Sequence, residues 1–219
     1  MGQHARCRSV VNAKQPPRVE ALEARSLLAC VLGSNAGILD GTLTIEGTNK
    51  NDAIHAERVD SGVVADSSDD SLTVSLNGKE VANCLLTDVT KLRIFGANGN
   101  DEITVADGVG ISCEINGGNG NDSLEGGDGD DTIIGDNGKD NIDGDDGNDL
   151  LQGGNGKDTI QGGAGNDVLQ GGTASDTLND PDGDQGLNGG PAPDIINGVA
   201  EPAPNRGHGR PAKNGDRPK

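Results

Sequence analysis

The stretch that decides the fold is GGNGNDSLEGGDGDDTII, residues 117–134. It consists of two nine-residue blocks that share glycine at positions one, two and four, aspartate at position six and an aliphatic residue at position eight. Glycine and acidic residues make up most of both blocks. Such a run is either a disordered acidic spacer or one part of a site whose other part is not protein.

The pattern continues without a gap over nine blocks, from Gly117 to Asn197. Glycine opens eight of the nine blocks. Position six is aspartate in eight blocks, at Asp122, Asp131, Asp140, Asp149, Asp158, Asp167, Asp176 and Asp194. Position eight is leucine or isoleucine in all nine, at Leu124, Ile133, Ile142, Leu151, Ile160, Leu169, Leu178, Leu187 and Ile196.

The aliphatic residue at position eight of every block excludes a disordered acidic spacer. Hydrophobic residues make up 31% of the chain, so nine aliphatic residues at one fixed phase would arise by chance on the order of 10⁻⁵ of the time. A disordered segment has no physical reason to keep such a period. The repeat therefore predicts a regular, stacked structure.

This pattern, GGxGxDxUx with U aliphatic, resembles the haemolysin-type (RTX) calcium-binding repeat. The resemblance implies an all-β fold, a parallel β-roll (β-solenoid) in which each GGxGxD is a turn and each xUx a short strand. Two blocks complete one coil, so blocks 18 residues apart stack on the same side. We expect a small β-rich cap domain to precede this roll.

The residue chemistry supports the same interpretation independently. Glycine allows the positive φ angles of a tight turn and leaves its carbonyl exposed. Ca²⁺ prefers six to eight oxygen ligands from carboxylates and carbonyls. Between stacked turns, such an ion would offset the repulsion of the aspartates, since residues 117–197 carry seventeen Asp, one Glu and only two Lys. We therefore expect this segment to be disordered without Ca²⁺ and to fold when it binds.

The candidate metal ligands are the aspartates at position six and the glycines of the best-preserved turns. They are Asp122, Asp131, Asp140, Asp149, Asp158, Asp167 and Asp176, with Gly117, Gly120, Gly126, Gly129, Gly135, Gly138, Gly144, Gly147, Gly153, Gly156, Gly162 and Gly165. Pairing at 18-residue spacing predicts four ions, at 122/140, 131/149, 140/158 and 149/167, and a fifth at 158/176. Gln185 replaces the ligand in the eighth block, and the last two blocks read as a decaying cap.

Some blocks depart from the pattern. Asp136 and Asp145 stand where the second glycine belongs, and Ala174 replaces a fourth-position glycine. Upstream of the frame, GTNKNDAI (47–54) and GANGNDEI (96–103) repeat the turn, with Asp52 and Asp101 at position six. Asp101 lies out of frame with Asp122, which we attribute to an insertion around residues 106–113.

We divide the chain into four parts: a leader at 1–37, a β-rich cap at 38–116, the calcium-binding β-roll at 117–197 and a disordered basic tail at 198–219. Short strands are expected within residues 41–47, 71–81 and 91–105. The run Leu-Asn-Gly-Lys at 76–79 predicts a type I′ hairpin. The tail is rich in Pro, Gly and basic residues, which favours disorder.

Residues 22–28, LEARSLL, resemble the LEPR-XLL motif at the amino end of large repetitive bacterial proteins, with Ala24 in place of proline. The resemblance implies sorting to the cell exterior; the alternative is an amphipathic helical turn. LLAC around Cys30 looks like a lipidation signal, but no apolar region precedes it. Of the other cysteines, Cys84 and Cys113 either pair in an oxidising compartment or stay as free thiols.

Composition excludes several functions. A net charge of −19 disfavours nucleic acid and anionic membranes, and no apolar run is long enough to insert into a membrane. No HExxH or GxSxG occurs, so we expect no enzymatic activity. The expected function is Ca²⁺ binding by a secreted or cell-surface protein with a structural or adhesive role. The alternative is a polysaccharide-recognition module or an accessory part of an extracellular enzyme or toxin system, with an envelope component or polysaccharide as partner.

Overall fold

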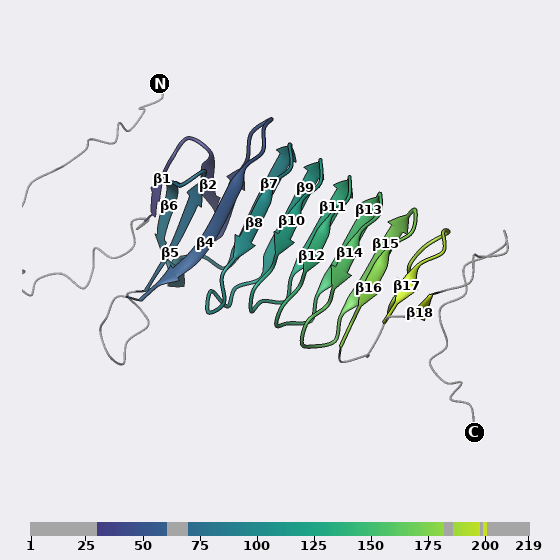
Figure 1. Cartoon of the computed structure of the whole chain (residues 1–219). Coiled ribbons are helices and arrows are strands. Elements are labelled where there is room, and N and C mark those ends of the chain that lie inside the picture. The colour runs from purple at the N-terminus through teal and green to yellow at the C-terminus, as the bar shows by residue number, and fades with distance from the viewer. Residues whose placement is uncertain (1–29, 61–69, 182–185, 198, 201–219) are drawn as a thin grey trace, which may run out of the picture.

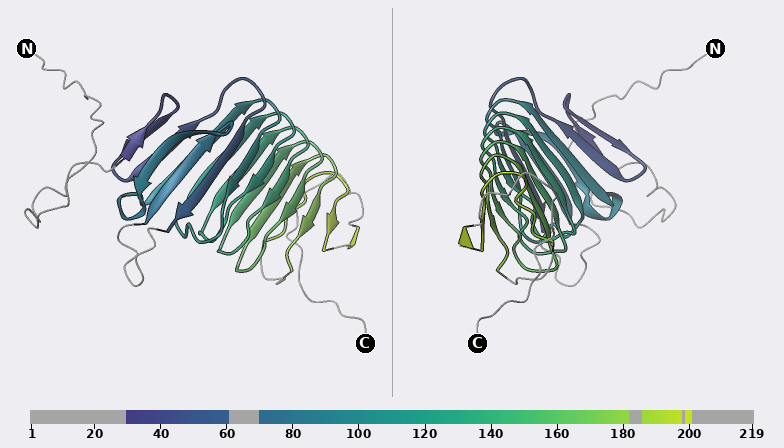
Figure 2. Two further views of the ribbon diagram at one scale, coloured as in Figure 1. Left: turned by 60° about the vertical axis from the view of Figure 1, so that its left-hand side comes forward. Right: turned by 90° about the vertical axis from the view of Figure 1, so that its right-hand side faces the viewer.

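Two β-sheets face each other, and from Lys91 to Asn179 the chain passes alternately from one to the other (Figure 1). The computed structural model describes residues 30–60, 70–181, 186–197 and 199–200. Within this part of the chain the elements are strands and one 3₁₀ helix, η2 (Leu86–Asp88). The expected all-β fold, a parallel β-roll, is confirmed, and the end-on view in Figure 2 shows the flattened coils stacked behind one another.

The larger sheet has eleven strands in the order β1-β6-β5-β4-β8-β10-β12-β14-β16-β17-β18. Their bounds are β1 (Cys30–Leu32), β4 (Ala53–Val59), β5 (Ser71–Leu76), β6 (Lys79–Leu85), β8 (Glu102–Val105), β10 (Ser123–Glu125), β12 (Asn141–Asp143), β14 (Thr159–Gln161), β16 (Thr177–Asn179), β17 (Ile195–Ile196) and β18 (Val199–Ala200). From β4 to β17 each neighbour pairs in parallel.

The smaller sheet has seven strands in the order β15-β13-β11-β9-β7-β3-β2. Their bounds are β2 (Ala36–Leu39), β3 (Thr42–Glu46), β7 (Lys91–Asn98), β9 (Cys113–Asn119), β11 (Thr132–Asn137), β13 (Leu150–Asn155) and β15 (Val168–Thr173). All pairings except β2 with β3 are parallel.

The aliphatic residue at position eight fills the space between the sheets. The register pairs Leu124 with Ile142 and Ile142 with Ile160, one coil of 18 residues apart. Seven of the nine are buried, at Leu124, Ile133, Ile142, Leu151, Ile160, Leu169 and Leu178. Leu187 and Ile196 are partly buried against the same core. Their strand neighbours point outward, as the strand alternation predicts.

Strands of the smaller sheet are longer than the expected three residues. β11, β13 and β15 continue through the first residues of the following turn, because Asp136 pairs with Gly154 and Gly154 with Gly172. The expected short xUx strand is correct only for the larger sheet, where β10, β12, β14 and β16 have three residues each.

The region before residue 117 shares both sheets with the roll. β3, β7 and β9 stack in parallel in one sheet, and β4, β8 and β10 do so in the other. The antiparallel β5–β6 hairpin is an excursion from the coil. Its turn has positive φ at Asn77 (54°) and Gly78 (73°), which confirms the type I′ turn. The expected strands at 41–47, 71–81 and 91–105 are also present.

The coil before the repeat is three residues longer than the coils of the repeat itself. Leu92 pairs with Cys113 and Glu102 with Ser123, both 21 residues apart, whereas Glu114 pairs with Thr132 at 18. The extra residues therefore lie between β8 and β9, where the insertion was expected. This connection also places Cys113 one coil before Asp131 in the stack.

The pairing considered for Cys84 and Cys113 is wrong. Cys84 forms a disulfide with Cys30, which joins β6 to β1. Cys113 is a free, buried thiol. Burial raises the pKa of this thiol, and the nearby carboxylates of Asp131 and Asp149 add to the increase.

Two expectations lie outside the described residues: the sorting motif at 22–28 and the basic tail beyond residue 200. Within the described part of the chain, no helix has the length and apolar character needed to cross a membrane.

Candidate metal centre

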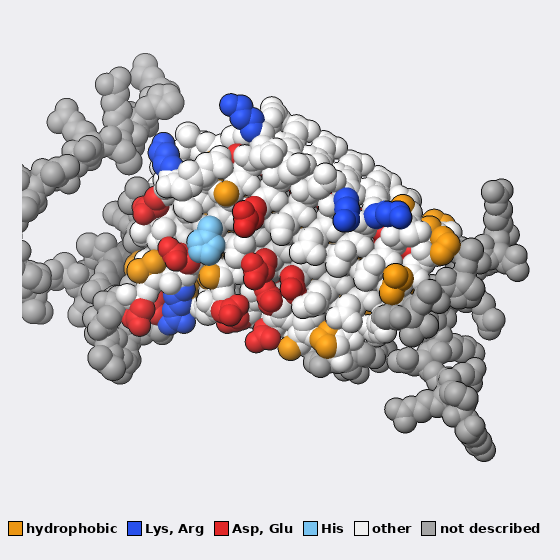
Figure 3. All heavy atoms as spheres, viewed as in Figure 1, with side chains coloured by type: hydrophobic (Ala, Val, Ile, Leu, Met, Phe, Trp, Pro, Cys, Tyr) orange, Lys and Arg blue, Asp and Glu red, His pale blue; other side chains and the backbone are white. Residues whose placement is uncertain are grey.

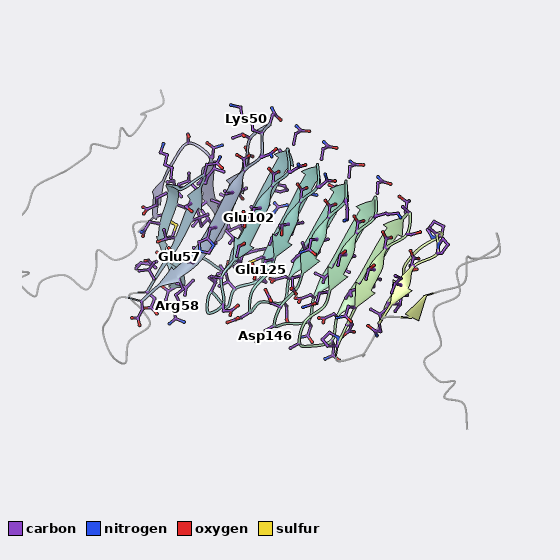
Figure 4. The ribbon with its side chains drawn as sticks, in the orientation of Figure 1. Lys50, Glu57, Arg58, Glu102, Glu125 and Asp146 are labelled. Atoms are coloured by element: carbon purple, nitrogen blue, oxygen red, sulfur yellow. A yellow bond between two sulfur atoms is a disulfide. The ribbon has the colours of Figure 1, made fainter. Side chains whose placement is uncertain are left out.

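The turns that join the two sheets stack into two rows, one along each edge of the roll (Figure 4). The long row leads from the smaller sheet to the larger one and comprises residues 47–52, 96–101, 117–122, 135–140, 153–158, 171–176 and 189–194. The short row leads back and comprises a first turn without aspartate, residues 108–113, followed by residues 126–131, 144–149 and 162–167. Lys50 marks the first turn of the long row in Figure 4, and Asp146 a turn of the short row.

The position-six aspartate of every turn in both rows is buried, with at most 3% of its surface exposed. These residues are Asp52, Asp101, Asp122, Asp140, Asp158, Asp176 and Asp194 in the long row and Asp131, Asp149 and Asp167 in the short row. Aspartate is rarely buried unless its charge is compensated. Each row therefore needs groups that satisfy both oxygens of these carboxylates.

A hydrogen-bond ladder satisfies the first oxygen. The backbone N–H of each aspartate donates to Oδ1 of the aspartate one coil further on, as from Asp122 to Asp140 and from Asp140 to Asp158, both at 2.9 Å. The short row has the same ladder, from Asp131 to Asp149 at 2.8 Å. Cys113 begins that row and donates its N–H to Asp131 Oδ1 at 2.6 Å.

The second oxygen is buried and has no hydrogen-bond partner in the structure. This holds, among the described residues, for Oδ2 of Asp101, Asp122, Asp131, Asp140, Asp149, Asp158, Asp176 and Asp194. A buried carboxylate oxygen without a partner lowers the stability of the folded state by roughly 1–3 kcal/mol, and by more when the group is charged. The regular recurrence of the same atom along both rows indicates a common partner that is not protein.

The first glycine of each turn leaves the space that this partner needs. A Cβ added at Gly126 would lie 2.5 Å from Asp131 Oδ2 and 2.9 Å from the carbonyl oxygen of Gly144 in the next coil. At Gly171 the corresponding distances are 2.5 Å to Asp176 Oδ2 and 2.6 Å to the Gly189 carbonyl oxygen. A carboxylate and a carbonyl thus point into one gap, between two adjacent coils.

These oxygens fit a hard cation such as Ca²⁺, whose ligands are carboxylates and backbone carbonyls. Among the described residues, no three His, Cys, Asp or Glu side chains gather at one point. The donors at each gap are a carboxylate oxygen and a backbone carbonyl oxygen. Bound there, the ion would supply the positive charge that the unpartnered oxygens lack.

The exposed acidic residues are a separate group. Glu57 and Glu102 point outward from the larger sheet, next to Glu125 (Figure 4). Acidic side chains gather on this face in Figure 3. Because these side chains are solvated, they do not need a bound ion.

Residues 116–151 and 152–179 match the model of the RTX calcium-binding nonapeptide repeat. These two segments are RTX repeats. No curated protein and no solved structure matches the chain. The RTX segments contain the best-preserved turns of both rows, and each coil of the roll in this region is built from two RTX blocks.

The structure places the predicted site residues of the RTX repeats in three positions. The aspartates form the two ladders. The first-position glycines border the gaps, at Gly117, Gly126, Gly135, Gly144, Gly153 and Gly162. The fourth-position glycines leave no room for a Cβ, because an added Cβ would lie 2.5 Å or less from a backbone carbonyl oxygen of the preceding coil, at Gly120, Gly129, Gly138, Gly147, Gly156 and Gly165.

The rows extend beyond the RTX repeats. Asp194 accepts the Asp176 N–H at 2.8 Å on one side, and Asp101 donates its own N–H to Asp122 at 2.8 Å on the other. The first turn of the short row was not predicted from the sequence. The signal for it is the in-frame block GVGISCEIN at 108–116, in which Ile115 keeps position eight and Cys113 replaces aspartate.

Burial raises the pKa of six position-six aspartates of the RTX repeats, namely Asp122, Asp131, Asp140, Asp149, Asp158 and Asp176. The pKa rises from an ordinary value of 3.8 to about 7 at Asp131 and Asp149, and to about 6 at Asp140 and Asp176. Desolvation is the largest cause; the donated backbone N–H opposes it, and carboxylates in adjacent coils add to it. Without a cation, protons therefore bind to these carboxylates near neutral pH.

We expect the metal-free roll to be more stable at pH 4.5 than at pH 7.5. Because the folded-state pKa is raised, the stability contributed by the protonated aspartates is full below about 4 and is lost as the pH rises through 6 to 7. Far-UV circular dichroism of protein stripped of metal on a chelating resin measures this. The β-sheet signal should strengthen on acidification, and equal signals at the two pH values would contradict it.

Proposed function

We propose that the protein is a secreted or cell-surface, calcium-dependent structural or adhesive β-roll that folds on binding about four to five Ca²⁺ ions. The RTX repeats carry the calcium-binding part of this proposal. The observation that supports the ion positions is the gap between adjacent coils, where the unpartnered Oδ2 of one coil and the glycine carbonyl of the next converge.

Two observations support an extracellular location and a structural role. The Cys30–Cys84 disulfide favours an oxidising compartment. Calcium sites of extracellular modules have Kd values of about 10⁻⁴–10⁻³ M, which fits a calcium-rich environment. On the larger sheet, β10, β12, β14 and β16 present a regular outer face of polar side chains.

Polysaccharide recognition has less support. Sugar-binding sites commonly use an aromatic face as a platform, and Phe95 is the one aromatic residue of the chain. The guanidinium carbon of Arg93 lies 5.4 Å from the centroid of the Phe95 ring. One face of this ring is therefore covered by an arginine side chain.

Calcium titration by isothermal calorimetry tests the proposal. The wild-type chain should bind several Ca²⁺ ions, and Asp149→Asn should bind fewer, because it removes the charge at the gap formed with Gly162. The matched control is Glu125→Gln, which removes one exposed charge from the outer face and should leave the number of ions unchanged. Absence of binding by the wild-type chain at millimolar CaCl₂ would refute the proposal.

A further inference from the structure

One turn outside the RTX repeats has the features of the gaps within them. We propose that residues 96–101 and 117–122 hold an additional Ca²⁺ ion between Asp101 and the Gly117 carbonyl, and that the row of ions ends there because protein hydrogen bonds replace the ion at Asp52. This inference rests on the proposed function, since it assigns the end of the same row of ions.

Asp101 has the same environment as the RTX aspartates. It is 2% exposed, and its Oδ1 accepts the backbone N–H of Asp52 at 2.8 Å. Its Oδ2 is buried and has no hydrogen-bond partner. Burial is the largest cause of the raised pKa of Asp101, and the nearby Asp52 carboxylate adds to it. The side chain therefore lacks the partner that its second oxygen requires.

The gap beside Asp101 is also preserved. A Cβ added at Gly96 would contact Asp101 Oδ2 and lie 2.6 Å from the Gly117 carbonyl oxygen. This matches Gly171, where the added atom lies 2.6 Å from the Gly189 carbonyl oxygen. Gly99 has φ 141°, close to the 138° of Gly120 one coil later. The backbone of this turn thus follows the RTX turns.

The unusual spacing of Asp101 does not disturb the long row. The three extra residues of this coil lie between β8 and β9, on the side of the short row. On the side of the long row, Gly99 N–H donates to the Asn119 carbonyl at 2.8 Å and Ser123 N–H to the Asp101 carbonyl at 2.8 Å. Adjacent turns of the long row therefore stack at this coil as they do in the repeat.

The next turn toward the N-terminus is different. Both oxygens of Asp52 accept hydrogen bonds: Oδ2 from the Thr48 N–H at 2.5 Å, and Oδ1 from the Thr48 hydroxyl at 3.1 Å and the Asn77 amide at 2.7 Å. Asn77 comes from the β5–β6 hairpin and also accepts the Ala53 N–H at 2.9 Å. These protein donors occupy the oxygens that a cation would need.

The fourth position of this terminal turn also departs from the pattern. Lys50 stands where the RTX turns have glycine, and it lies at the end of the row in Figure 4. Its backbone does not have the positive φ of Gly99, Gly120 and Gly138. The turn therefore has neither the free carboxylate oxygen nor the backbone conformation of the other turns, and the hairpin closes the row without metal.

Counting bound ions by native mass spectrometry in CaCl₂ tests the inference. Asp101→Asn keeps Oδ1 as the acceptor of the Asp52 N–H and removes the negative charge of the side chain. This variant should therefore bind one ion fewer than the wild-type chain. Gly96→Ala keeps Asp101 but places a Cβ in the gap, and it should lose the same ion. Asp52→Asn should bind the wild-type number.

Asp140→Asn separates this inference from the proposed function, because Asp140 belongs to the RTX repeats. If Asp140→Asn loses ions while both Asp101→Asn and Gly96→Ala keep the wild-type number, the additional site is refuted and the proposed function stands. If the wild-type chain binds no Ca²⁺, both are refuted. Loss of an ion in Asp52→Asn would overturn the assignment of Asp52 as the metal-free end.

Discussion

Removal of Ca²⁺ with EGTA at pH 7.5 is expected to abolish most of the β-sheet signal of the roll in far-UV circular dichroism. Within the RTX repeats each block contributes one buried aliphatic residue, while its aspartate buries a carboxylate beside those of the adjacent coils. Negative carboxylates buried side by side destabilise the folded chain unless a cation compensates their charge. The ions are therefore required to favour the folded state.

Readdition of CaCl₂ should restore the signal, and MgCl₂ at the same concentration is the control. Mg²⁺ is smaller, demands near-octahedral geometry and gives up its water reluctantly, so it should restore much less. An identical spectrum in EGTA and in 10 mM CaCl₂ would contradict the prediction, because it would show that the buried carboxylates are tolerated without metal.

Gly138→Ala is expected to destabilise the calcium-loaded protein by roughly 3 kcal/mol or more. Gly138 has φ 144°, a conformation that residues with a Cβ rarely adopt. An added Cβ would also lie 1.5 Å from the Gly120 carbonyl oxygen, so the two coils would have to separate at this point. Urea unfolding in saturating CaCl₂, followed by circular dichroism, measures the loss of unfolding free energy.

Gly37→Ala is the matched control. Gly37 lies in β2, its φ is not positive, and no atom outside its neighbours lies within 4 Å of an added Cβ. The same chemical change should therefore alter stability by no more than about 0.5 kcal/mol. Equal effects of the two substitutions would mean that close stacking of the coils does not contribute to stability.

The repeat was the predictable part of the fold because its signal is local and recurs. Position eight alone identified Leu124, Ile142 and Ile160 as core residues, and the 18-residue pairing of coils followed from the resemblance. The unequal strand lengths of the two sheets were not predicted, because they depend on which turn residues pair across coils.

The N-terminal coils were harder to predict, since they depend on contacts between residues distant in sequence. The Cys30–Cys84 disulfide forms because β1 pairs with β6, and no spacing rule links these two cysteines. The hydrogen bond from Asn77 to Asp52 requires the hairpin to fold back onto the first turn. The nine-residue frame extends to the block at 108–116, but this turn was not predicted because Cys113 replaces the aspartate at position six.

The ladder of backbone amides has a direction. Each coil donates an N–H to the carboxylate of the coil that follows it in the sequence, as Asp122 does to Asp140. The last completed coil therefore presents an N–H for the next aspartate and a carboxylate oxygen for the gap with the next glycine carbonyl. An added coil at the C-terminal end would thus meet the same donor and the same carboxylate oxygen as every coil before it.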